Sequence, residues 1–312
     1  MNNSELFIEG LKNNNKELLA KVQKIDIHNH AAYSCKKSYL TKNNIQLPEQ
    51  KIYDIASLNE FSKSYINPIQ YTEEGLKFLL RGDFDNCIKT GVKVVSPSVD
   101  YKACVRIFDS NIEEFISFLQ TFKYDNLKIL WDLGISRDSY KDEHSEVIEK
   151  LIKTKIFTGI DLYATENSTL NYKFVKFYGL ANDLGLITKV HTGEQLGADY
   201  VKECILDFNP KQIQHGIHIV EDINVMQLAK EKGIVFNICP TSNIVLGYAK
   251  SIKEHPLKVM VDFGLNVTIG TDDILFFDSD INDEYLKLYN EKVLSAEQLN
   301  NIRIYGLELV NN

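Results

Sequence analysis

Four short segments of this sequence carry residue types that bind metal ions and move protons. They are His28-Asn29-His30, His191-Thr192-Gly193-Glu194, His215-Gly216 and Asp272-Asp273. Imidazole and carboxylate groups are zinc ligands, and a water activated by zinc beside acid and base groups is a hydrolytic nucleophile. If the fold brings the four segments together, we expect them to hold one zinc ion and to hydrolyse a C–N bond.

Each segment lies at the end of a short apolar run that predicts a β-strand. We expect eight strands, at Val22–His28, Val92–Val99, Leu127–Leu133, Phe157–Leu162, Leu186–His191, Gln212–His215, Ile234–Cys239 and Asn266–Gly270. Helical patterns occur at Leu6–Lys21, Ile112–Phe122, Glu143–Lys153, Leu170–Leu184, Asp222–Lys232, Leu257–Phe263 and Glu291–Leu309. This alternation predicts an α/β fold, a (β/α)8 barrel of the TIM type with a leading N-terminal helix, in which the carboxyl ends of the strands share one mouth.

One stretch, from Ala31 to about Gly91, is too long for a simple crossover between the first two strands. It contains a helical pattern over Ile55–Leu80 that carries Phe61, Tyr65 and Phe78. We expect this insertion to cover the barrel mouth as a helical lid.

Length and composition indicate one metal-dependent hydrolase domain over residues 1–312. The formal net charge of −8 argues against nucleic acid or an anionic membrane as the main partner, so we expect a small-molecule substrate. The five cysteines are scattered without a C-x-x-C pair, and the N-terminus lacks the features of a signal peptide. We therefore expect a cytoplasmic protein, either a monomer or a small homo-oligomer.

Each motif taken alone also has a simpler explanation. His28 and His30 share one strand face, yet two polar residues also finish ordinary strands. Taken alone, Glu194 is more simply interpreted as a solvated acid at a helix start, and Asp273 as a helix cap. The combination favours a site, because the motifs end different predicted strands, where barrel enzymes place catalysis.

We do not expect the remaining histidines to bind metal or to take part in catalysis. We expect His218 to be a loop or helix-start residue, and His144 and His255 to be solvated. Asp26 is in phase with His28, and we expect it to support the site or the barrel floor.

Together the motifs resemble the adenosine deaminase family of zinc aminohydrolases. The resemblance covers nearly the whole chain and depends on His28-x-His30, His191-Thr-Gly-Glu194, Gln214-His215-Gly216, Cys239-Pro240-Thr-Ser-Asn243 and Thr271-Asp272-Asp273. The intervals, 24 positions from His191 to His215 and 57 from His215 to Asp272, are similar to the family pattern.

The resemblance implies a ligand set and two proton-transfer residues. Zinc would be held, one ion per chain, by His28, His30, His191 and Asp272, with the attacking water in the fifth position. His215 would orient that water and accept its proton, and Glu194 would protonate N1 of a purine. Attack at C6 and loss of ammonia would then convert an adenine compound into a hypoxanthine compound.

The resemblance also implies substrate contacts. Asp273 would bond N7, the backbone N–H of Ala164 would meet N3, and Gly193 and His30 would complete the set. Four departures leave the exact substrate open, namely Ala31-Ala32-Tyr33 in place of an apolar residue, an acid and a glycine, Ala164 in place of glycine, Asn237 in place of glutamate, and Ile274 in place of proline. The missing acid is the usual ribose contact. Lys36 and Lys37 either reach a phosphate or other 5′ group or are solvated.

Adenosine, a 5′-modified adenosine and an N6-substituted adenine nucleotide therefore all stay open as substrates. Two further alternatives are another mononuclear amidohydrolase-type hydrolase and a catalytically silent purine-binding protein. A two-metal enzyme would need a carboxylated lysine near the fourth strand, where the stretch from Asp161 to Glu166 has none. Glu194 and His215 argue against a silent protein, since binding alone needs no proton donor.

Overall fold

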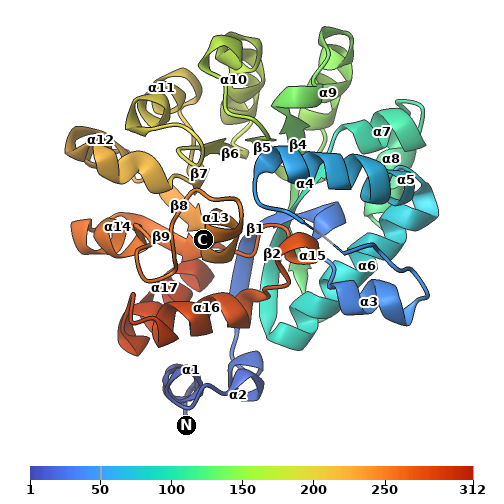
Figure 1. Ribbon diagram of the computed structural model, residues 1–312. Helices are drawn as coiled ribbons and strands as arrows, with labels where there is room; N and C mark the ends of the chain where they lie inside the picture. Colours follow the sequence, from blue (N-terminus) through green and yellow to red (C-terminus); the bar gives the residue numbers. More distant parts are fainter. Residues whose placement is uncertain (50, 312) are drawn as a thin grey trace.

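The computed structural model describes residues 1–49 and 51–311. Within them, eight parallel strands follow one another in chain order around a nearly closed barrel (Figure 1). They are β1 (Lys24–His30), β2 (Val92–Asp100), β4 (Trp131–Ser136), β5 (Phe157–Tyr163), β6 (Ile187–Thr192), β7 (Gln212–His215), β8 (Val235–Ile238) and β9 (Asn266–Ile269). A two-residue strand, β3 (Lys128–Ile129), pairs with β2 beside this path. The predicted (β/α)8 barrel is confirmed.

The barrel closes between β1 and the residues that follow β9 in the sequence. Asn29 on β1 forms a parallel bridge with Asp272, and the Asp272 N–H donates to the His28 carbonyl at 2.9 Å. Two of the sequence motifs therefore lie side by side where the barrel closes.

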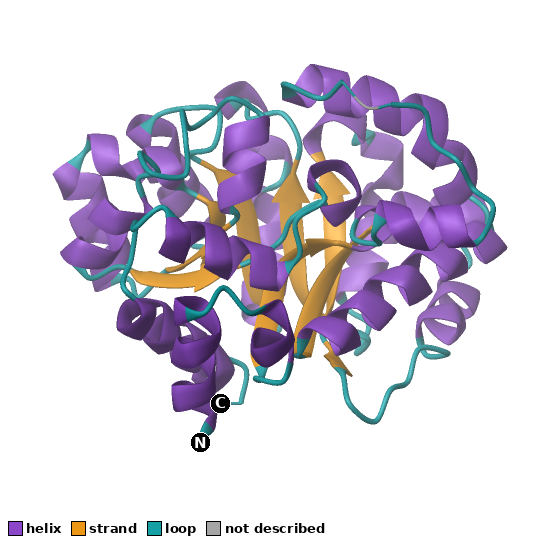
Figure 2. Cartoon of the chain, turned by 60° about the horizontal axis from the view of Figure 1, so that its bottom comes forward, coloured by secondary structure: helices purple, strands orange, loops and turns teal. Residues whose placement is uncertain are grey.

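Helices form the outer layer around the strands (Figure 2). The longer ones are α1 (Asn3–Lys12), α8 (Ile112–Leu119), α9 (Ser145–Ile152), α10 (Val175–Asp183), α11 (Ala198–Phe208), α12 (Ile223–Glu231), α16 (Ile281–Asn290) and α17 (Ala296–Leu309). Shorter helices are α2 (Lys16–Ala20), α7 (Lys102–Ile107), α13 (Pro240–Val245), α14 (Leu257–Phe263) and α15 (Ile274–Phe277). Short 3-10 turns lie at η1 (Ala31–Tyr33), η3 (Arg137–Ser139), η4 (Asp142–His144), η5 (Ser168–Lys173) and η6 (Ile217–Glu221).

Two predicted helices are divided in the structure, and a third is shorter than predicted. The leading helix is two helices, because Asn14 adopts a left-handed φ of 49° and the Asn15 side chain caps α2 by accepting from the Leu18 N–H. The pattern at Leu170–Leu184 becomes η5 followed by α10, and the chain's last predicted helix begins only at Ala296, where the Ser295 hydroxyl caps α17.

The insertion after β1 is helical, as predicted, but it is not one helix. It contains α3 (Lys37–Lys42), α4 (Ile55–Phe61), the π-helical turn η2 (Ser62–Ile66), α5 (Asn67–Gln70) and α6 (Glu73–Thr90). Pro68 lacks an N–H to continue the hydrogen-bond ladder, and Thr72 caps α6 by accepting from Gly75. Residues of α4, η2 and α5 line the cavity at the barrel mouth, so the segment covers the site.

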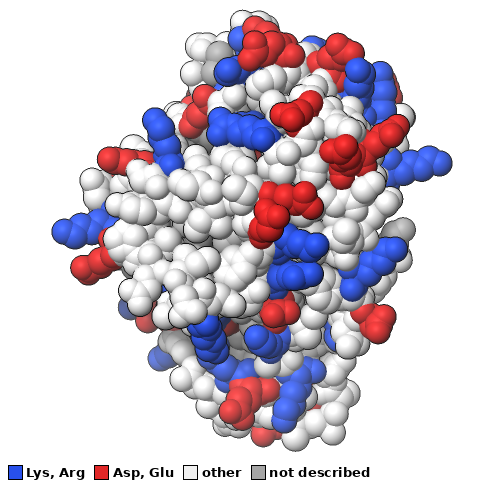
Figure 3. Space-filling view, turned by 90° about the vertical axis from the view of Figure 1, so that its right-hand side faces the viewer, with Lys and Arg blue, Asp and Glu red and all other residues white. Residues whose placement is uncertain are grey.

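The molecular surface carries both signs of charge. Basic and acidic side chains are interspersed on the face drawn in Figure 3. All five cysteines are buried and free of disulfides. Among the helices of the described residues, none combines the length and apolar character needed to cross a membrane.

Asp83 on α6 gives the fold a testable pH dependence. Its buried carboxyl accepts from the Asn29 side chain at 3.2 Å, and burial raises its pKa to about 8. Between pH 4 and pH 8 the unfolded carboxyl is ionised while the folded one keeps its proton, so this group lowers stability as pH rises. We expect the free energy of unfolding, measured in urea, to become larger for Asp83→Asn relative to wild type as the pH rises from 5 to 8. Equal pH slopes for the two proteins would contradict the assignment.

Candidate active site

The carboxyl ends of four strands bring the predicted metal ligands and His215 together. One donor atom from each of His28, His191, His215 and Asp272 lies within 4.8 Å of the others, and all four residues are buried. His30 Nε2 lies 3.2 Å from His191 Nε2 and 3.3 Å from Asp272 Oδ1. The structure therefore places the five residues in one cluster, in which His30 contacts two members of the tighter group of four.

Left-handed turns at the strand ends aim these side chains. Asp272 has a φ of 57°, and Gly193 between His191 and Glu194 has a φ of 69°. A Cβ at Gly193 would stand 2.4 Å from Val201 Cγ2, so this turn requires glycine. The turn lets His191 and Glu194 face the same cavity although they lie three residues apart.

The hydrogen bonds of His28 and His191 define which ring nitrogen is free. His28 Nδ1 lies 2.9 Å from the Asn237 carbonyl, which can only accept, so Nδ1 carries the hydrogen. Burial would raise the pKa of Asp161, but the His191 ring beside it holds that pKa below its usual value, so Asp161 is an anionic acceptor for His191 Nδ1 at 3.1 Å. With its hydrogen on Nδ1, each ring presents an Nε2 lone pair to the cluster.

These lone pairs fit a metal ion. The Nε2 atoms of His28 and His191 are 3.2 Å apart, and two nitrogens bound tetrahedrally at zinc distances are about 3.3 Å apart. Two buried lone pairs that face each other at this distance repel unless a cation lies between them. Burial and the neighbouring histidines hold the pKa of His28 well below its usual value, so a proton on that ring is disfavoured. Three imidazoles and one carboxylate suit a single divalent ion.

Glu194 lies beside this cluster with the properties of a proton donor. Its Oε1 is 3.5 Å from His215 Nε2 and has no hydrogen-bond partner among the described residues, although the side chain is buried. Burial raises the pKa of Glu194 well above its usual value, and the carboxyl groups of Asp272 and Glu166 add to the effect. A carboxylic acid that keeps its proton at neutral pH can act as a general acid.

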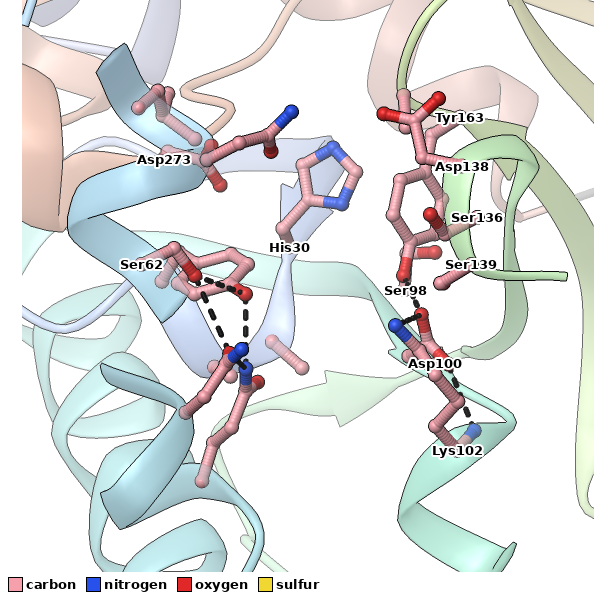
Figure 4. A pocket seen from close by; sticks show the side chains of 18 of the residues that line it. His30, Ser62, Ser98, Asp100, Lys102, Ser136, Asp138, Ser139, Tyr163 and Asp273 are labelled. Atoms are coloured by element: carbon pink, nitrogen blue, oxygen red, sulfur yellow. Dashed lines mark hydrogen bonds and ion pairs between the residues drawn. The ribbon is translucent and has the colours of Figure 1, made fainter. Parts of the chain in front are cut away.

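The cluster opens into a cavity of about 560 Å³. Asp273 projects into it, and its Oδ1 is buried without a hydrogen-bond partner in the described part of the chain (Figure 4). Burial, followed by the charges of Asp272 and Glu194, raises the pKa of Asp273 well above its usual value. Asp273 therefore offers the cavity a protonated carboxyl group.

Of the other two residues that the family resemblance implies as substrate contacts, Ala164 lines the cavity and Gly193 does not. Ala164 lines the cavity and adopts a left-handed φ of 73°, a conformation that normally favours glycine. Gly193 is not among the residues that line the cavity within the described chain, and its carbonyl accepts from the His218 N–H at 2.9 Å. Its place is in the backbone turn rather than at the cavity surface.

The cavity has two polar walls, and apart from Tyr33 their residues were not predicted. Ser98, Asp100 and Tyr163 form one wall, where the Tyr163 hydroxyl donates to Asp100 (Figure 4). Opposite, the Tyr33 hydroxyl lies 2.8 Å from Ser62 Oγ and accepts from Gln70 at 2.9 Å. The only available signal for the first wall was the position of Ser98 and Asp100 at the carboxyl end of a strand.

Asp161 and Arg137 were likewise missed as supports of His191. Arg137 donates to the His191 carbonyl at 2.7 Å, while Asp161 bonds its ring. Their strand-end positions were visible in the sequence, but the partner that each contacts was not.

The predictions for residues outside the motifs have mixed outcomes. Asp26 supports the barrel, as predicted, by accepting from the Thr271 hydroxyl at 2.5 Å, and His218 is a surface residue that pairs with Glu221. His144 is half-buried and lies 3.2 Å from the Tyr101 hydroxyl. The prediction of a solvated His255 is wrong, because this ring is buried between Asn243 and the Leu257 N–H.

Neither Lys36 nor Lys37 lines the cavity, in so far as the described residues define it. Lys36 instead pairs with Asp280 at 2.5 Å, at the start of α16. The alternative in which these lysines reach a 5′ phosphate is therefore not supported.

Comparisons with known proteins identify deaminases and a related amidohydrolase as similar to this chain. The family profile described as Adenosine deaminase matches residues 108–310. A putative adenosine/adenine deaminase of Treponema pallidum is 30% identical over 81% of this chain and 87% of its own length. The structure of an Arabidopsis N6-mAMP deaminase has a TM-score of 0.78 at 20% identity, covering 94% of each chain. An amidohydrolase from Burkholderia ambifaria, solved with bound zinc, has a TM-score of 0.76 at 15% identity, covering 94% of this chain and 87% of its own.

Proposed function

The chain belongs to the adenosine deaminase family and is an aminohydrolase of adenine-type substrates, and we propose that it deaminates adenosine or a related 6-aminopurine nucleoside or nucleotide by hydrolysis. Ammonia and an inosine-type compound are the products. The observation that carries this proposal is the buried carboxyl group of Glu194, which lies 3.5 Å from His215 Nε2 at the edge of the histidine and carboxylate cluster and whose pKa is raised by burial.

The proposed metal is one zinc ion, held by His28, His30, His191 and Asp272. When bound, zinc lowers the pKa of a water molecule so that hydroxide is available near neutral pH. Asp161 and the Asn237 carbonyl keep the ligand rings in the required tautomer. Ser242 donates to Asp272 Oδ2 at 2.6 Å and so fixes the carboxylate.

The proposed substrate contacts follow from the protonation of the cavity's acids. The carboxyl group of Asp273 donates to the N7 lone pair, and the Ala164 N–H meets N3. Glu194 gives its proton to N1, which makes C6 electrophilic for the water that His215 orients. The oxygen of that water adds at C6, one of its protons goes to the amino group, which leaves as ammonia, and the other restores the proton of Glu194.

A substituted purine fits better than a free base. The cavity extends past the proposed purine contacts to Ser98, Asp100 and Lys102, and the Ser98 hydroxyl is buried with no partner among the described residues. Such polar groups suit hydroxyl or other polar substituents of a nucleoside.

Selectivity at the 5′ side is testable. Ala32 and Tyr33 line the cavity, and Ala32 offers no acceptor to a sugar hydroxyl. Losing one hydrogen bond costs about 0.5–1.5 kcal/mol, so we expect 5′-deoxy or 5′-methylthio analogues to match or exceed adenosine in kcat/KM. Tyr33→Ala should shift these ratios, whereas Tyr172→Ala on the surface should not. A strong preference for adenosine that is unchanged in Tyr33→Ala would contradict this account of the segment.

The function itself is tested by a screen for ammonia release. The substrates are adenine, adenosine, 2′-deoxyadenosine, and 5′-modified and N6-methylated analogues, each incubated with zinc-loaded protein. We expect ammonia and the matching 6-oxopurine in equal amounts from at least one nucleoside. Binding without ammonia release from any of them would favour a silent purine-binding protein.

A further inference from the structure

A buried chain of hydrogen bonds leads from His215 away from the cavity. His215 Nδ1 lies 3.1 Å from Asn243 Nδ2, and Asn243 Oδ1 lies 3.2 Å from His255 Nε2. His255 Nδ1 in turn accepts from the Leu257 N–H at 3.1 Å. Asn243 and His255 are both buried, and neither lines the cavity as the described residues define it.

The backbone donor at Leu257 fixes every hydrogen in this chain. Because an amide N–H can only donate, His255 Nδ1 must accept, and a neutral imidazole then carries its hydrogen on Nε2. Burial lowers the pKa of His255 to about 4, which keeps the ring neutral near pH 7. His255 Nε2 therefore donates to Asn243.

The same direction passes through the amide to His215. Asn243 must present its oxygen to His255. In the flipped orientation its NH2 group would point at His255 Nε2, and that ring would then need a lone pair on both nitrogens, which an imidazole cannot have. The NH2 group of Asn243 is thus turned to His215 Nδ1, which must accept. The hydrogen of the neutral His215 ring is left on Nε2.

The opposite side of the ring leads to the same tautomer. His215 Nε2 faces Asp272 Oδ2 at 3.7 Å, and this oxygen already accepts from Ser242. An N–H is attracted to this carboxyl oxygen, whereas a lone pair would be repelled by it.

We propose that Asn243 and His255 are positioning residues that hold His215 as the Nε2–H tautomer, so that His215 enters the reaction as a hydrogen-bond donor. The inference rests on the proposed function, which gives His215 its place beside the attacking oxygen. It revises the expectation that His215 accepts the proton of the water, because Nε2 has no free lone pair. It also separates His215 from His28 and His191, whose Nε2 atoms are free for the metal.

The donor has a defined task. An Nε2–H aimed at the cluster can bond the attacking oxygen and stabilise the negative charge that develops on it during addition.

Nitrogen NMR of the zinc-loaded wild-type protein, labelled in its histidines, tests the tautomer without any variant. The His215 signals are assigned from their loss in His215→Gln. We expect hydrogen on Nε2 and an accepting Nδ1. Hydrogen on Nδ1, or on both nitrogens, would overturn the proposal. Since this readout needs no turnover, it stands apart from a failure of the proposed deamination.

Asn243→Asp tests the consequence with an isosteric change. One carboxylate oxygen still accepts from His255, while the other accepts from His215 and draws the hydrogen to Nδ1. We expect the NMR pattern of His215 to invert and kcat to fall about 10- to 100-fold, with KM and metal content little changed. Asn300→Asp, a buried change beside Arg303 on α17, is the matched control. An inverted tautomer with unchanged or raised kcat would overturn the donor role.

Discussion

Replacing Glu194 by glutamine should lower kcat for a 6-aminopurine nucleoside by about 10²- to 10⁴-fold, the usual contribution of general acid catalysis. The side chain is buried, and its pKa is raised above its usual value by burial and by Asp272 and Glu166, so it holds a proton to give. Glutamine keeps the shape and the polar contacts but has no acidic proton. Metal content and substrate binding should therefore change little.

The comparison needs a glutamate whose loss changes only surface charge. Glu146→Gln on α9 removes one partner of an exposed ion pair with Lys150 and should keep wild-type kcat. Steady-state kinetics of both variants, with metal analysis of the same samples, separates loss of the acid from loss of the ion. A Glu194→Gln enzyme with near-wild-type kcat would remove this residue from the proposed chemistry.

The second large effect is expected from His191→Ala. This ring lies 3.2 Å from both His28 Nε2 and His30 Nε2, so it lies at the centre of the donor set. Loss of residues that merely support metal ligands costs about 10- to 100-fold in affinity or activity. Loss of a ligand itself should cost more than about 100-fold in kcat and leave the purified protein largely without metal.

Elemental analysis gives the measurement, with His218→Ala as the surface control. Wild type and His218→Ala should each hold one zinc ion per chain. Full occupancy in His191→Ala, or two tightly held ions in wild type, would show that the ligand set is wrong.

The barrel and its strand-end residues were predictable because each strand has a recognisable pattern in its own short stretch of sequence. An apolar run that ends in a polar motif identifies both the strand and its carboxyl end, and parallel topology makes these ends converge. Gln212–His215 and Leu257–Phe263 were predicted with the bounds that the structure has for β7 and α14.

Other features depend on contacts between residues distant in the sequence. His255 lies in polar sequence, yet the fold buries it against Asn243, which is itself directed at His215. Asp161 likewise has no distinguishing feature in the sequence. Its role is visible only once the structure shows that it bonds the ring of His191. The breaks in the leading helix and in the insertion have a local cause instead. They depend on caps at Asn15 and Thr72, each of which bonds a residue three positions on, and patterns of hydrophobicity alone do not reveal such caps.

The most direct test of the account follows oxygen from water into the product. Zinc-loaded protein is incubated with adenosine, or with the nucleoside preferred in the screen, in H2(18)O, and product and ammonia are quantified together. Hydrolytic deamination predicts one labelled oxygen in each 6-oxopurine formed, one ammonia released with it, and almost none of either from Glu194→Gln. Product that lacks the label, or fully metal-loaded protein that releases no ammonia from any of the tested 6-aminopurines, would contradict the account.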